Sequence, residues 1–213
     1  MFRFFSRPAP LLLALAFCTF IPLMNAMVNT VQIPTGTYAE DSAHLAVAPL
    51  SWFLHVLAGA AFGLAGPMNF ALALRRRFGR LHRATGRIFV GAGVVLGVTA
   101  FSLLFSVEPQ RTPVVDIARG LFGLALLVAL AMAITAIRAR DIPRHRAWAI
   151  RAYAIGMGSG TAALVLIPIY LVTRAPPISL ASDVIIVTWW ARNICFAEWI
   201  IHRINVTNRQ VST

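Results

Sequence analysis

Histidine is the residue type in this chain with the clearest capacity for chemistry. A neutral imidazole can ligate a metal, and the sequence has no paired cysteines and no clustered carboxylates to compete for that role. His82 and His145 each open a His-Arg-Ala triplet, at residues 82–84 and 145–147. Because both triplets fall where an apolar stretch begins after a basic connection, we predict that the two histidines lie at matching depth at one membrane boundary. The histidines are His44, His55, His82, His145 and His202.

Two histidines at equal depth on separate helices can hold a planar b-type haem, with one imidazole nitrogen on each face of the iron. Arginines beside them can pair with the haem propionates. Haem b is therefore one interpretation of this pair, with His82 and His145 as its ligands, although the sequence alone leaves the cofactor open. The plainer alternative is that both are ordinary polar residues in basic turns. The arginines within one or two turns of these histidines are Arg83, Arg87, Arg146 and Arg151.

A third histidine, His55, lies on a stripe of small residues. Gly59 and Gly63 follow it at i+4 and i+8, so all three share one face of a helix. Close helix packing is the interpretation we favour for this stripe. The alternative is a flat ligand that lies against the glycines and is ligated by His55, with Met24 or Met27 as the second ligand.

The composition predicts that a lipid bilayer positions these residues. The chain has 213 residues, of which 59% are hydrophobic and 12% charged, and its mean hydropathy is +0.76. This leaves too little polar surface for a soluble globule. The formal charge of +12 would suggest nucleic acid in a soluble protein, but here the basic residues flank apolar segments. The two cysteines, Cys18 and Cys195, give neither a disulfide framework nor a c-type haem motif.

We predict one integral membrane domain over residues 1–213, an all-α polytopic bundle of about six transmembrane helices. Fifteen of the nineteen arginines fall on one side of the predicted spans, and only Arg111, Arg119 and Arg174 fall on the other. The excess of positive charge predicts that both termini are cytoplasmic, in a bacterial inner membrane. The predicted helices cover residues 8–27, 45–74, 85–107, 114–137, 143–172 and 183–201.

Several ionisable residues fall inside these apolar stretches and need partners. Arg119 lies one turn inside its helix and can reach outward, and Glu198 can pair with His202 at i+4. Arg192 lies deepest and has no acidic residue at i±3 or i±4. Its partner must come from another helix, lipid phosphate or a ligand, and the last stretch either crosses the membrane or lies on its surface.

Residues 55–90 resemble a bacterial family of predicted membrane proteins, the domain of unknown function 2306. A second block, His145 to Arg151 with Tyr153, resembles the other basic motif of that family. The resemblance implies a four-helix core with peripheral helices and implies no activity. Where the family pattern leads us to expect glutamine, this chain has Asn69. The matching residues of the first block are His55, Gly59, Gly66-Pro67, Phe70, Leu81-His82-Arg83 and Gly86-Arg87.

Three functions fit these observations. The first is a b-type haem protein that moves electrons across or along the bilayer, so any enzyme activity would be membrane redox chemistry. The second is a transporter for a small anionic or lipid-like solute, with Arg119, Arg192 and the glycine stripe lining the path. The third is a non-catalytic scaffold or regulator whose basic loops bind anionic lipid head groups or an acidic partner. Catalytic motifs of soluble hydrolases and phosphate-binding loops are absent from the sequence.

Overall fold

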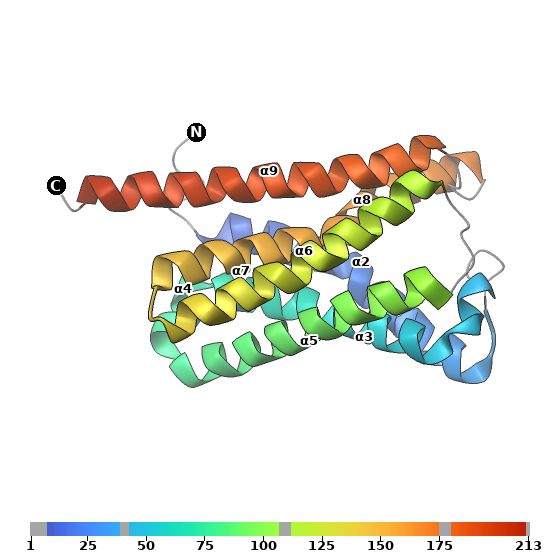
Figure 1. Ribbon diagram of the computed structural model, residues 1–213, viewed down its shortest axis with the longest axis horizontal. Helices are drawn as coiled ribbons and strands as arrows, with labels where there is room; N and C mark the ends of the chain where they lie inside the picture. The colour runs from blue at the N-terminus through green and yellow to red at the C-terminus, as the bar shows by residue number, and fades with distance from the viewer. Residues whose placement is uncertain (1–7, 39–42, 107–111, 175–179, 212–213) are drawn as a thin grey trace.

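The computed structural model describes residues 8–38, 43–106, 112–174 and 180–211, and within these ranges the chain forms helices and turns without strands (Figure 1). The predicted all-α fold is therefore confirmed. In chain order the elements are α2 (Pro8–Thr35), the 3-10 helix η1 (Ala43–Val47), α3 (Pro49–Phe70), α4 (Leu72–Arg77), α5 (Gly79–Ser106), α6 (Pro113–Arg138), α7 (Ile142–Gly156), α8 (Gly158–Thr173) and α9 (Leu180–Val211).

Five segments of the described chain are long and apolar enough to cross a bilayer. Large apolar side chains cover much of the outer surface of the bundle, as expected where lipid rather than water is the solvent. The protein is thus a multi-pass membrane protein that contacts the lipid bilayer. The five segments are Pro49–Phe70, Gly79–Ser106, Pro113–Arg138, Ile142–Thr173 and Leu180–Val206.

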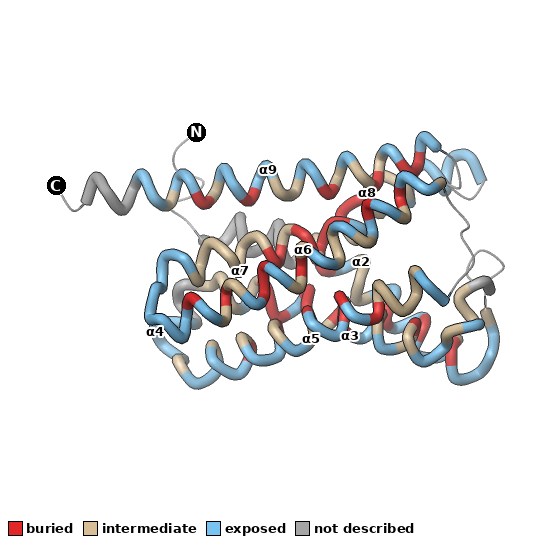
Figure 2. The backbone as a smooth tube through the Cα atoms, in the orientation of Figure 1, coloured by how far each residue is buried: buried red, intermediate tan, exposed pale blue. Residues whose placement is uncertain are grey.

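Four helices, α3, α5, α6 and α7, supply most of the central core, and buried residues gather where they pack (Figure 2). Helix α3 packs on α5, α6 packs on α7, and α5 and α6 join the two pairs. Helix α2 covers α3, while α9 runs along α7 and α8 (Figure 1). This arrangement confirms a four-helix core with peripheral helices. We call the end that carries α4 and the α6–α7 turn the arginine-rich end.

The centre of the core is aromatic and is built against glycines. Phe62 is fully buried and stacks on Phe89, with 4.4 Å between the ring centroids. The ring of Tyr153 lies over Gly66, where a Cβ atom would overlap it. Because glycine has no side chain, an aromatic ring of one helix can contact the backbone of the next helix. These contacts allow α3, α5 and α7 to pack closely together.

The first helix is longer than predicted. The first helix is predicted over residues 8–27, but α2 continues to Thr35. Polar side chains do not break it because they bond back to its own carbonyls: the Thr30 hydroxyl donates to the Ala26 oxygen at 2.6 Å. The helix stops at Gly36, which has a φ of +68°. The amides of Gly36 and Thr37 then donate to earlier carbonyls, which is the usual glycine-based termination.

Two predicted helices are each divided in the structure. The predicted helix 45–74 ends at Phe70 because Ala71 is extended, with a ψ of 106°, and the short α4 follows. The predicted helix 143–172 is divided at Met157 into α7 and α8. Beside that break, the ring of Trp190 occupies the place where a side chain on Gly158 would lie. The break at Met157 therefore lies where α9 packs closely against this span.

Candidate functional site

His82 and His145 lie at the arginine-rich end, at equivalent positions of two helices. His82 is the fourth residue of α5, which begins at Gly79, and His145 is the fourth residue of α7, which begins at Ile142. Both helices start at this end and run in the same direction. The two imidazoles are close enough to interact electrostatically. The structure therefore places at the same end of the bundle, at equivalent helix positions, the two histidines for which the sequence predicted matching depth.

The hydrogen bond of His145 fixes which of its ring nitrogens carries the proton. Its Nδ1 lies 2.9 Å from the backbone oxygen of Ala133 on α6. A carbonyl oxygen only accepts, so Nδ1 carries a proton, and in the neutral ring Nε2 therefore carries the lone pair. Metal-ligating histidines are commonly oriented by such a bond to the second nitrogen. The sequence gives no signal for this contact, because the acceptor is the backbone oxygen of Ala133 and not a side chain.

His82 differs because its buried Nδ1 has no hydrogen-bond partner among the described residues. Positive charge surrounds it, since Arg75 and Arg83 both interact with it electrostatically. Its own carbonyl accepts from the Thr85 hydroxyl at 3.1 Å. An unpartnered polar atom in a buried position is costly, and it marks a place where a ligand would be stabilising.

Asn69 lies next to this region and links α3 to α5. Its Oδ1 accepts from the Thr85 hydroxyl at 3.0 Å, while its Nδ2 donates to the Ala65 oxygen at 2.8 Å. The sequence led us to expect a glutamine at this position. The shorter amide reaches Thr85, one turn beyond His82, and so helps to fix the start of α5 against the end of α3.

The four arginines predicted to pair with propionates have different surroundings. Arg83 and Arg87 are exposed on α5. Arg151 forms a two-bond ion pair with Glu198 on α9, with Nε to Oε1 at 2.6 Å, and its guanidinium also lies over the Trp148 ring. The predicted pairing of Glu198 with His202 is therefore replaced by an interhelical pair. The sequence offered no spacing rule for that pair because its members are 47 residues apart.

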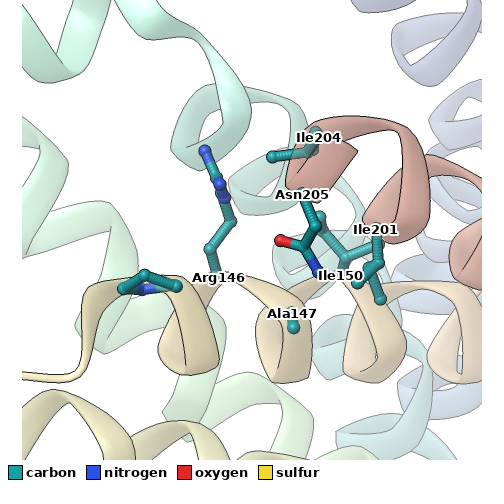
Figure 3. Close-up of a pocket in the computed structure, with 7 residues that line it drawn as sticks. Arg146, Ala147, Ile150, Ile201, Ile204 and Asn205 are labelled. Atoms are coloured by element: carbon teal, nitrogen blue, oxygen red, sulfur yellow. The ribbon is translucent and has the colours of Figure 1, made fainter. Parts of the chain in front are cut away.

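Arg146 faces a groove between α7 and α9 (Figure 3). The groove is shallow and open to the outside, and it encloses no space large enough for a water molecule. Arg146 also interacts electrostatically with Arg75 of α4. The residues that line the groove are Pro143, Arg146, Ala147, Ile150, Ile201, Ile204 and Asn205.

His55 lies toward the opposite end of the bundle, where Thr99 of α5 contacts it at 3.0 Å. The Thr99 hydroxyl donates to the Val95 oxygen at 2.7 Å, so the same oxygen accepts from Nδ1 of His55. Sequence reasoning missed Thr99, although it is the polar residue at the matching depth on the next helix. Met24 and Met27 lie on the outer surface of the described bundle.

Side chains from neighbouring helices cover the glycine stripe on α3. A Cβ at Gly59 would meet Leu96 at 3.7 Å, and one at Gly63 would meet Thr19 at 3.4 Å. Gly66 faces Tyr153, and the carbonyl of Pro67 accepts from the Ala71 amide at 3.1 Å. These contacts favour helix packing as the role of the stripe.

The polar residues of the last span find partners on other elements or on α9 itself. The guanidinium of Arg192 lies over the Trp189 ring, 4.2 Å from its centroid. Asn193 donates to the Ala154 oxygen at 3.3 Å, and Trp190 donates to the Ile155 oxygen at 3.0 Å. These are carbonyls next to the break at Met157. Side chains of α9 thus donate hydrogen bonds to carbonyls at the break. Without a donor, these carbonyl groups would be costly in lipid.

The described residues contain no group of three or more histidine, cysteine or acidic side chains placed to hold a metal ion. A metal bound by His82 and His145 would therefore need its other ligands from elsewhere. Arg119, the remaining charged residue near the opposite end, forms an ion pair with Asp116 at 2.9 Å.

Comparison with known proteins gives one family. The model of the family described as "Predicted membrane protein (DUF2306)" matches residues 52–201. Neither curated proteins nor solved structures give a match. The matched range contains α5, α6, α7 and α8 in full, most of α3, and α9 as far as residue 201. The chain belongs to this family of predicted membrane proteins.

Proposed function

We propose that this member of the DUF2306 family binds a b-type haem through His82 and His145 and transfers electrons across or along the membrane. The family description supplies the membrane location and no activity, so the support comes from the site. The observation that carries the proposal is the buried, unpartnered Nδ1 of His82 within electrostatic range of His145.

The number of protein ligands favours haem over a bare metal ion. Structural and catalytic sites for zinc and most other transition metals use three or four protein ligands. The described residues offer two histidines here and no third ligand. A porphyrin supplies four nitrogens by itself, so two axial imidazoles complete the iron coordination.

The neighbouring residues suit this role. The Ala133 carbonyl orients the His145 ring and leaves its Nε2 as the ligating atom. Arg83 is the arginine beside His82 and would balance a propionate charge. Arg151 is already paired with Glu198, so we do not assign it to the cofactor. When bound, the haem iron would supply one-electron chemistry, while the helices hold both imidazoles in place.

Absorption spectroscopy tests the proposal. Protein purified in mild detergent from haem-sufficient cells is expected to show a Soret band that shifts on reduction by dithionite. His82→Ala and His145→Ala should each abolish or strongly reduce that band. His202→Ala is the matched control, because this histidine is exposed on α9. A colourless preparation, or equal loss in the control, would rule out the proposal.

A second candidate is favoured by the break in the α7–α8 span. Discontinuous helices near the middle of the membrane are common in transporters, where freed backbone groups bind solutes. At this break, however, Trp190 and Asn193 bond to the Ile155 and Ala154 carbonyls. Arg119 and Arg192 are exposed on the outer surface. Proteoliposome flux that depends on Arg192 and not on His82 would support transport over electron transfer.

We also propose that the arginine-rich end faces the cytoplasm, with both termini on that side. The arginines of α4, the start of α5 and the α6–α7 turn support this orientation. A reporter inserted at Gly79 should be active only in its cytoplasmic form. Activity of the periplasmic form at this position would reverse the orientation.

A further inference from the structure

We infer that the groove between α7 and α9 binds one anionic phospholipid, with its phosphate held by Arg146 and an acyl chain along Ile150 and Ile204. This inference does not require haem binding, although Arg75 also interacts electrostatically with His82. It concerns a different face of α7, and neither His82 nor His145 lines the groove.

The charges at this place lack a balancing partner within the described chain. Half-buried Arg146 has Arg75 as an electrostatic neighbour, and two like charges repel each other. Neither arginine forms an ion pair with a described carboxylate. The two acidic residues nearest along α7 and α9 are committed elsewhere: Asp141 accepts from the Arg144 amide, and Glu198 binds Arg151. An anion beside both guanidinium groups would turn their repulsion into attraction.

The shape and lining of the groove select an amphiphilic anion. Ala147 and Ile150 of α7 face Ile201 and Ile204 of α9, which gives an apolar wall on both sides (Figure 3). Arg146 rises from α7 on one side of the groove, and Ile204 and the Asn205 amide lie across from it on α9 (Figure 3). Arg146 and Asn205 thus place polar groups in the groove beside a wall that suits a hydrocarbon chain. Basic pockets between transmembrane helices bind lipid head groups in this way.

Native mass spectrometry of the purified protein measures this binding directly. The probes are phosphatidylglycerol and phosphatidylcholine with identical acyl chains, and we expect phosphatidylglycerol to bind more tightly. Arg146→Ala should weaken that binding roughly tenfold, because a charge-assisted hydrogen bond is lost. Ala147→Phe should weaken it without changing any charge, since the ring fills the groove. Size-exclusion profiles establish that each variant is folded.

Arg144→Ala is the matched control, because Arg144 is exposed two residues earlier on the same helix. Its loss should change binding by less than about twofold at physiological salt, where exposed charges are screened. Equal losses for Arg144→Ala and Arg146→Ala would overturn the inference in favour of diffuse attraction. So would equal binding of the two lipids, or full displacement of phosphatidylglycerol by inorganic phosphate or glycerol 3-phosphate.

Discussion

Arg151 and Glu198 join α7 to α9 through two parallel hydrogen bonds, Nε to Oε1 at 2.6 Å and Nη2 to Oε2 at 2.9 Å. The guanidinium also lies 4.6 Å from the centroid of the Trp148 ring. Each charge alone would be costly within a membrane-spanning helix. Together they fix the register of the last helix on the core.

Exchanging these two charges should preserve the contact. Arg151→Glu or Glu198→Arg alone places like charges against each other, and we expect each to lower the free energy of unfolding by roughly 1.5–3 kcal/mol. The double exchange should recover at least half of that loss. Reversible unfolding in mixed micelles measures all three variants. Additive losses in the double variant would mean that the pair contributes no coupling.

Adding one methyl group at Gly66 should destabilise the core. A Cβ there would overlap the Tyr153 ring, which Phe62 and Phe70 also contact. We expect Gly66→Ala to cost roughly 1–3 kcal/mol. Gly91→Ala is the matched control, because nothing lies within 4 Å of its added Cβ, and it should be neutral or stabilising by up to about 1 kcal/mol. Equal thermal stability of the two variants would contradict this account of the packing.

Asp183 anchors the beginning of α6. It is 1% exposed, and its Oδ2 accepts from the backbone amide and the hydroxyl of Thr112 at 2.9 and 2.7 Å. Asp183→Ala leaves those two donors without this acceptor, so a loss of roughly 2–6 kcal/mol is expected, since each abandoned donor costs about 1–3 kcal/mol. Asp116→Ala removes only the half-exposed pair with Arg119 and should cost less than about 1 kcal/mol. Denaturation midpoints that rank the variants in the reverse order would refute the assignment.

The hydrogen bonds of two histidines predict their tautomers. Ala133 accepts from Nδ1 of His145, and Thr99 accepts from Nδ1 of His55. In the protein without bound ligand, at a pH where both rings are neutral, nitrogen NMR should therefore show protonated Nδ1 and bare Nε2 in each. Thr99→Val should change the tautomer balance of His55 and leave His145 unaltered. Bare Nδ1 in His145 would remove the basis for assigning its Nε2 as a ligand atom.

Hydropathy was sufficient to predict the class of fold and most of the helices. The predicted helix 114–137 is observed as Pro113–Arg138, because turn-forming and basic residues bound it on both sides. The predicted start at residue 85 was six residues late, since α5 begins at Gly79. Arginine suggested a connection there, yet it is also a good helix former, so the basic run forms the first turns of the helix.

The internal contacts were beyond sequence reasoning. The polarity of Asn193 and Glu198 made the last span uncertain, but both residues reach α7. The break at Met157 also needed knowledge of α9, because Trp190 fills the space beside Gly158. Hydropathy measures whether a segment suits lipid. It does not report which partner each polar group will find.

His82 and His145 share one local frame because each is three residues beyond the first residue of its helix. An extra residue between Gly79 and His82 would turn that imidazole by about 100° around the axis of α5 and shift it by about 1.5 Å. His145 would stay where it is. Insertions and deletions in these two short stretches should therefore be far less tolerated than exchanges of one arginine for another cation, because the count of residues aligns the rings.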